Sequence, residues 1–107
     1  MVTTFTDVAA FNTAFAQQVA TNEKFIGLFF AGIDDRTGLP WCPDCIFATP
    51  YVDRVVNEAV ENGRNVLKGT VTHQEWKGWS EGKNHPYRKD PYDASGVPTM
   101  ILFQGED

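Results

Sequence analysis

Apolar residues along the chain follow two spacings in turn, which predict strands and helices in alternation. Val2–Phe5 is rich in β-branched residues and predicts a short first strand. A helix is then expected from Thr6 or Asp7. Its apolar face comprises Val8, Phe11, Phe15 and Val19. Lys24–Ala31 is almost continuously apolar, as is typical of a central strand that is covered on both faces.

A long helix follows a loop in the middle of the chain. Gly32–Pro40 combines Gly, Asp and Pro and therefore predicts a loop. The helix is expected from Pro43 to about Glu61, with a kink at Pro50 and an end at Asn62-Gly63. The residues expected on its apolar face are Val52, Val55, Val56 and Ala59.

Two more strands are expected in the rest of the chain, at Asn65–Val71 and Thr99–Phe103. Between them, Thr72–Gly96 is rich in Gly, Pro, Trp and charged residues and predicts short helices at most. Strands and helices in this order predict one α/β domain over residues 1–107, a length that supplies a single hydrophobic core.

Composition and charge exclude several function classes. The net charge of −5 would repel nucleic-acid phosphates, so no nucleic-acid partner is expected. No segment approaches the roughly 20 apolar residues of a membrane span, so no membrane partner is expected either. The N-terminus lacks the basic and apolar regions of a signal peptide. We therefore expect a cytoplasmic, reducing setting.

The two cysteines, Cys42 and Cys45, lie three positions apart where the predicted long helix begins. Unsatisfied N–H groups and the positive end of the helix dipole would stabilise a thiolate at Cys42. Pro43 suits the first helical position, and the three-residue offset returns Cys45 to the same helix face, within disulfide reach. In a reducing compartment, such a pair is more often catalytic than structural.

The sequence supports other interpretations of the cysteine pair less well. A structural zinc site needs four Cys or His ligands, and the two histidines, His73 and His85, lie far along the chain without finger-like spacing. A structural disulfide across three residues would constrain very little of the unfolded chain. Two inert cysteines on a core helix remain an alternative, which the Trp41-Cys42-Pro43 start disfavours.

The order of elements resembles the thioredoxin fold. Trp41 precedes the first cysteine, Pro50 follows the second by five residues, and Val97-Pro98-Thr99 opens the last predicted strand. The chain is similar over essentially its whole length to the cytosolic Clot family of thioredoxin-related proteins. The features that carry this narrower resemblance are Trp-Cys-Pro-Asp-Cys, the long loop before it, Trp76-Lys77 and Tyr87-Arg88-Lys89.

Thiol chemistry predicts that Cys42 attacks a substrate disulfide and that Cys45 then resolves the mixed disulfide. The residues expected to support this reaction are Trp41, Pro43, Asp44 and Pro98. The resemblance implies a cis bond at Pro98 and substrate binding by the backbone of Val97, Pro98 and Thr99. It also implies thioredoxin reductase as a partner, with electrons passed indirectly from NADPH, no bound cofactor or metal, and small or exposed disulfides such as cystine as substrates.

The sequence departs from thioredoxins in two ways. Gly27-Leu28-Phe29 occupies the stretch where thioredoxins carry a buried Asp that accepts a proton from the second cysteine. Deprotonation of Cys45 is therefore expected to use Asp44 or water. The resemblance also implies a further strand and helix after Thr99–Phe103. Because the sequence ends near this strand, we expect an open sheet edge, and hence a homodimer or marginal stability.

Two alternative function classes stay open. A glutathione-dependent, glutaredoxin-like reductase is one, because a proline directly after the first cysteine is also usual there. A non-enzymatic interaction domain on a thioredoxin scaffold is the other. Trp41 and Pro50 favour the thioredoxin-like reductase over the first, and the intact dithiol argues against the second.

Other polar and aromatic residues are interpreted structurally. Aromatic and basic side chains alternate between residues 76 and 92. The aromatic ones are Trp76, Trp79, Tyr87 and Tyr92, and the basic ones are Lys77, Lys83, Arg88 and Lys89. Acidic residues neutralise these cations locally: Glu75, Glu81, Asp90 and Asp93. A packed loop cluster is therefore expected rather than a nucleic-acid stacking surface. Asp34-Asp35-Arg36 is expected at a solvated loop tip, and the resemblance implies that this loop narrows access to Cys42. His85 is expected at the surface.

Overall fold

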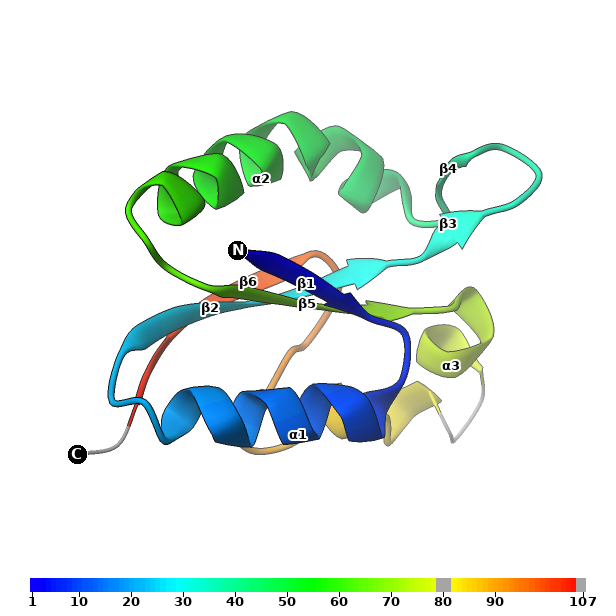
Figure 1. The fold of residues 1–107 in the computed structure, drawn as a ribbon. Helices are drawn as coiled ribbons and strands as arrows, with labels where there is room; N and C mark the ends of the chain where they lie inside the picture. The colour runs from blue at the N-terminus through cyan, green and yellow to red at the C-terminus, as the bar shows by residue number, and fades with distance from the viewer. Residues whose placement is uncertain (79–81, 106–107) are drawn as a thin grey trace.

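Four strands form one mixed sheet in the computed structural model, which describes residues 1–78 and 82–105 (Figure 1). In sheet order the strands are β1 (Val2–Phe5), β5 (Val66–Val71), β2 (Lys24–Ala31) and β6 (Thr99–Gln104). The first three are parallel, and β6 pairs antiparallel with β2. The predicted strands and the central place of Lys24–Ala31 are thereby confirmed, and β6 lies at an edge of this sheet.

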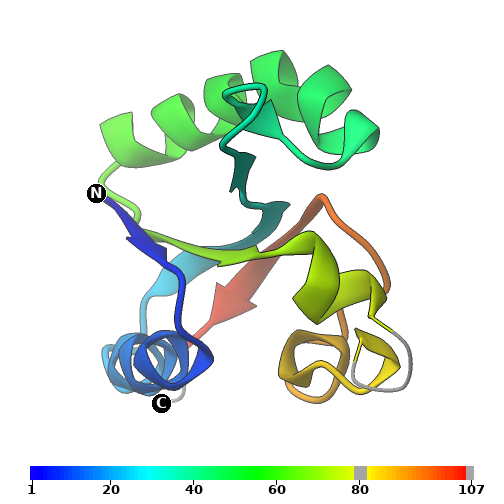
Figure 2. The same ribbon diagram turned by 90° about the vertical axis from the view of Figure 1, so that its right-hand side faces the viewer.

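Helices cover both faces of the sheet. The long helix α2 (Pro43–Glu61) arches over one face (Figure 1). The other face carries α1 (Val8–Val19) and, beside it, the irregular segment that contains the 3-10 helix η1 (Pro86–Arg88); Figure 2 shows both below the sheet. The short helix α3 (His73–Lys77) directly follows β5. This arrangement confirms the predicted α/β architecture.

The ends of the two long helices follow from local chemistry. Asp7 caps α1, because its carboxylate accepts hydrogen bonds from the backbone N–H groups of Ala9 and Ala10. Pro50 lies inside α2, as predicted. Gly63, just beyond the last turn of α2, has φ of +79°, a conformation that costs glycine little and ends the helix.

An aromatic cluster around Phe11 fills the space between the sheet and α1. The Phe11 side chain is 0% exposed. Ring centroids lie 5.0 to 5.8 Å from its own for Phe5, Phe29, Tyr87 and Tyr92. The Tyr87 ring packs so closely on β5 that a Cβ at Gly69 would lie 2.8 Å from its hydroxyl oxygen. A side chain at Gly69 would therefore displace the cluster.

Three predictions need correction. Within the predicted loop Gly32–Pro40, β3 (Ile33–Asp34) and β4 (Leu39–Pro40) form a hairpin. Gly38 has φ of +70° in its turn, and the Asp34 carbonyl accepts from the N–H groups of Thr37 and Gly38. The hairpin was not predicted because strands of two residues show no periodicity.

The second correction concerns Val55 on α2. Val55 is 42% exposed, whereas Val52, Val56 and Ala59 face inward.

His85 is the third correction, because it is 5% exposed rather than on the surface. Its ring lies against those of Trp76 and Tyr87, and its Nδ1 accepts a hydrogen bond from the Tyr87 N–H. Burial lowers the pKa of His85, although Glu75 opposes this shift. Trp76, Tyr87 and Tyr92 are buried, as the packed-cluster prediction requires, while Trp79 and Glu81 lie outside the described residues.

Candidate dithiol site

The cysteine pair lies where α2 begins. Cys42 is the N-cap residue, with an extended backbone, and its carbonyl accepts hydrogen bonds from the N–H groups of Cys45 and Ile46 at 3.0 and 3.2 Å. Pro43 takes the first helical position, where no N–H is needed. Both cysteines are free thiols. The structure therefore confirms that Cys42 lies at the N-terminal, positive end of the helix.

The two thiols differ in burial. Cys42 is 8% exposed and Cys45 is 0% exposed, so the first cysteine is the more accessible of the pair. Burial, reinforced by the nearby Cys42 and Asp44, raises the pKa of Cys45 to about 11, although a hydrogen bond with the backbone of Ala31 opposes the shift. Cys45 therefore stays a neutral thiol near pH 7 unless a group removes its proton.

This difference predicts the order in which the thiols react with a small alkylating agent. Cys42 is expected to be labelled first near neutral pH. Labelling of Cys45 should rise about tenfold for each pH unit and level off only near pH 11, because the thiolate is the reactive form. Mass spectrometry of digested protein after timed labelling measures both rates. A Cys45 rate that levels off near pH 9 would contradict the raised pKa of Cys45. Equal rates for both thiols at pH 7 would contradict the role of Cys42 as the more reactive thiol.

The segment before β6 meets Cys42 across the site. The Cys42 thiol donates a hydrogen bond to the Val97 carbonyl, with 3.7 Å between sulfur and oxygen. The Val97–Pro98 bond is cis, as the resemblance to thioredoxins implied. The Thr99 hydroxyl donates to the Gly96 carbonyl and so closes the turn into β6. Val97, the first of the three residues predicted from sequence to bind substrate, thus contacts the sulfur of the predicted nucleophile.

Trp41 anchors the chain that leads into Cys42. Its indole N–H donates to the Val71 carbonyl at 2.7 Å, and its backbone N–H donates to the Gly32 carbonyl at 3.2 Å. The ring of His73 lies edge-on to the Trp41 ring, with 5.0 Å between centroids. Sequence reasoning missed His73 at this site, since nothing in the sequence indicates which loop meets Trp41.

The surroundings of Cys45 bear on how it loses its proton. Leu28 of β2 is 2% exposed and fills part of the stretch that holds an Asp in thioredoxins. Within residues 1–78 and 82–105, no Asp or Glu is buried. Asp44, in the first turn of α2, is exposed to solvent. A route through Asp44 or water stays the prediction for deprotonation of Cys45.

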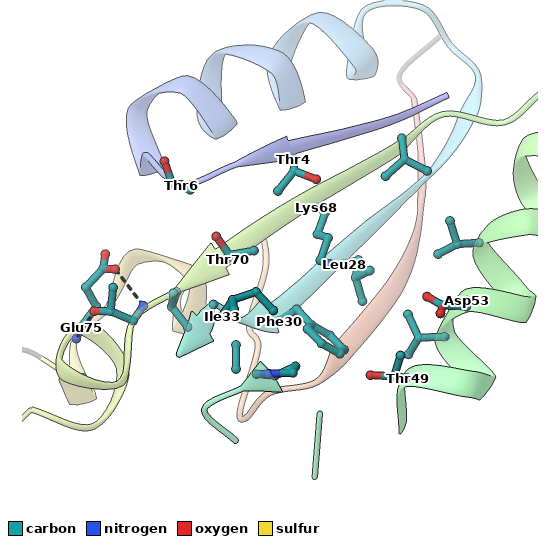
Figure 3. A pocket seen from close by; sticks show the side chains of 18 residues that line it. Thr4, Thr6, Leu28, Phe30, Ile33, Thr49, Asp53, Lys68, Thr70 and Glu75 are labelled. Carbon is teal, nitrogen blue, oxygen red and sulfur yellow. Dashed lines mark hydrogen bonds between the residues drawn. The ribbon is translucent and has the colours of Figure 1, made fainter. Parts of the chain in front are cut away.

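A separate groove lies between α2 and the sheet (Figure 3). It has a volume of about 770 Å³, and its lining includes Phe30 and Lys68 from the sheet and Thr49 and Asp53 from α2. The Lys68 ammonium lies 4.8 Å from the centroid of the Phe30 ring. Neither cysteine lines this groove, so it is distinct from the dithiol.

Within residues 1–78 and 82–105, no cluster of three or more His, Cys, Asp or Glu side chains is arranged to hold a metal ion. None of the helices found there has the length and apolar character needed to cross a bilayer.

Comparison with known proteins adds a family to this geometry. Residues 4–107 match the family described as thioredoxin domain-containing protein 17-like, thioredoxin domain. The thioredoxin-like protein Clot of rice is 34% identical over 108 residues, which cover 91% of this chain and 74% of that protein. The Clot protein of Arabidopsis thaliana is 31% identical over 80 residues, or 74% of this chain.

A human relative, thioredoxin domain-containing protein 17, is 29% identical over 82 residues, or 77% of this chain. The chain spans just over half of the Arabidopsis protein, 57%, and 63% of the human one. The match therefore covers part of each of these two proteins and not the whole.

Proposed function

Because the chain belongs to the thioredoxin domain-containing protein 17-like family, which includes Clot-like proteins, we propose that it is a thiol–disulfide oxidoreductase. The observation that carries the proposal is the thiol of Cys42 at the N-terminus of α2, in contact with the Val97 carbonyl beside cis-Pro98. A nucleophile and a backbone edge for an extended substrate lie side by side there, as disulfide exchange requires.

The reaction proceeds in two exchanges. The Cys42 thiolate attacks one sulfur of a substrate disulfide, breaks the S–S bond, and expels the other sulfur as a thiolate that takes up a proton. Cys45 then loses its proton and attacks the sulfur of Cys42. The second half of the substrate leaves as a thiol. The protein ends with a Cys42–Cys45 disulfide, and the substrate has gained two electrons and two protons.

Regeneration of the dithiol needs an electron source, which we propose to be an NADPH-dependent thioredoxin reductase in the cytoplasm. Two alternatives predict different behaviour. A glutaredoxin-like enzyme would accept electrons from glutathione, whereas a non-enzymatic interaction domain would accept them from neither glutathione nor thioredoxin reductase. The test oxidises the full chain, supplies either thioredoxin reductase with NADPH or glutathione, and counts free thiols over time. Fast recovery with the reductase supports the proposal. Recovery with glutathione alone favours the glutaredoxin-like alternative.

We further propose that small or exposed disulfides such as cystine are preferred over folded-protein disulfides. The β3–β4 hairpin immediately precedes Trp41 and Cys42, and Ile33 and Leu39 on it are exposed. An ordered hairpin beside the nucleophile would obstruct a bulky substrate more than a small one. The net charge of −5 would also slow encounters with acidic proteins, an effect that salt screens.

Shortening Asp34–Gly38 is therefore expected to raise kcat/KM for a folded-protein disulfide by about fivefold or more, with little change for cystine. The matched control is Asp35→Asn with Arg36→Gln, which removes two exposed charges and keeps the hairpin length. Initial rates at two ionic strengths separate the charge effect from the steric one. If the shortened protein gains nothing on the protein substrate, steric control by the hairpin is wrong.

A further inference from the structure

Arg88, at the end of η1, makes an unusual set of hydrogen bonds to backbone carbonyls. Its Nε donates to Gly82 at 2.9 Å, its Nη1 to Ser95 at 3.0 Å and its Nη2 to Trp76 at 3.1 Å. One side chain thus joins three separate stretches of the chain, of which the first in sequence includes α3. A planar guanidinium is suited to this, because its donors point in fixed directions.

The guanidinium is also held from one side by an aromatic ring. Its central carbon lies 3.7 Å from the centroid of the Trp76 ring, a close cation–π contact. Trp76 is 2% exposed and belongs to α3, whose start is fixed by a capping box between Thr72 and Glu75. Arg88 therefore packs against α3, which directly follows β5.

The contact with Ser95 leads to the dithiol site. Ser95 is two residues before Val97, whose carbonyl accepts the hydrogen bond from the Cys42 thiol. Two residues of extended chain span about 7 Å at most, so fixing the Ser95 carbonyl limits where the Val97 carbonyl can lie. Gly96, between them, has open space where a Cβ would be and adds little restraint of its own. On the other side, β6 holds the chain from Thr99 onward.

We propose that Arg88 is a positioning residue for the substrate-binding backbone of Val97–Thr99, an inference that rests on the function proposed above. Arg88 fixes the chain before this segment, as the pairing of β6 with β2 fixes the chain after it. Its role is exerted through Ser95, so it does not contact the substrate. A Lys at this position would keep the charge but lose the fork that reaches three carbonyls at once.

The test compares Arg88→Lys with wild type on two substrates. One is cystine, and the other is a disulfide-linked dimer of an extended pentapeptide that contains one cysteine. We expect KM for the peptide to rise about tenfold in Arg88→Lys, because main-chain hydrogen bonds to a displaced segment are lost. The kcat values, KM for cystine and alkylation of Cys42 should stay within about twofold of wild type. Lys89→Gln, which removes the exposed neighbouring cation, is the matched control and should behave as wild type.

Amide hydrogen exchange provides a second readout that does not depend on activity. Amides in residues 94–99 are expected to exchange about tenfold faster in Arg88→Lys, while those of Phe25–Ala31 in the central strand stay protected. Faster exchange together with the change in peptide KM supports the proposal. Unchanged exchange in residues 94–99, or equal losses on both substrates, overturns it. If wild type reduces neither substrate, the proposed function fails, and the exchange result still decides whether Arg88 anchors the segment.

Discussion

Cys42→Ser is expected to lower the rate of disulfide reduction by at least about a thousandfold, because a serine hydroxyl does not attack a disulfide at neutral pH. The substitution removes one sulfur from a helix start whose backbone geometry depends on Pro43 and the Cys42 carbonyl, so the fold should be unaffected. The measurement is the rate of thiol release from cystine, with thioredoxin reductase and NADPH as the electron source.

The control for this experiment is Asn57→Ser, an exposed position on the same helix, which should keep the wild-type rate. Thermal unfolding of both variants checks that loss of activity is not loss of structure. A Cys42→Ser protein that still reduces cystine at more than a few per cent of the wild-type rate would exclude Cys42 as the nucleophile.

Phe11→Ala is expected to have the largest effect on stability, a loss of about 3–5 kcal/mol in the free energy of unfolding. Phe11 is fully buried, and its ring lies within 5.4 Å, centroid to centroid, of the Phe29, Tyr87 and Tyr92 rings. Small domains have only about 5–15 kcal/mol in total, so this variant should unfold at a much lower urea concentration.

Gln17→Ala, an exposed position on the same helix, is the matched control and should change the free energy of unfolding by less than about 0.5 kcal/mol. Urea titration followed by far-UV circular dichroism gives both values. A loss below about 1 kcal/mol for Phe11→Ala would show that the aromatic cluster rearranges to fill the cavity, contrary to the close packing of its rings.

The sequence was sufficient for most of the architecture, for identifiable reasons. Lys24–Ala31 predicted a central strand because both of its faces are buried, which leaves a continuous apolar run. The ends of α2 were predictable because Pro43 and Asn62-Gly63 are strong local signals. Val55 was wrongly predicted on the buried face of α2, because the spacing of apolar residues along a helix does not show which of them a neighbouring element covers.

The candidate site was predictable where it depends on local sequence, and less so where it depends on tertiary contacts. The place of Cys42 at the helix start follows from residues 41–45 alone. The Trp41 bond to the Val71 carbonyl joins residues 30 positions apart, and no sequence pattern encodes it. The contacts of Arg88 were not predictable for the same reason: within Tyr87-Arg88-Lys89 it supported only the family resemblance, whereas its partners are three backbone carbonyls. His85 was misplaced because a lone polar residue gives no sign of the rings that cover it.

The proposed mechanism requires that Cys42 forms a mixed disulfide with the substrate and that Cys45 resolves it. Intact-protein mass measurement after brief exposure to cystine at pH 7 tests it most directly, in reduced Cys45→Ser and Cys42→Ser proteins side by side. Cys45→Ser is expected to accumulate one half-cystine per chain. Cys42→Ser should stay unmodified, because the remaining thiol is buried and its pKa is raised to about 11. Adduct formation at equal rates in the two variants, or in Cys42→Ser alone, would exclude Cys42 as the attacking thiol.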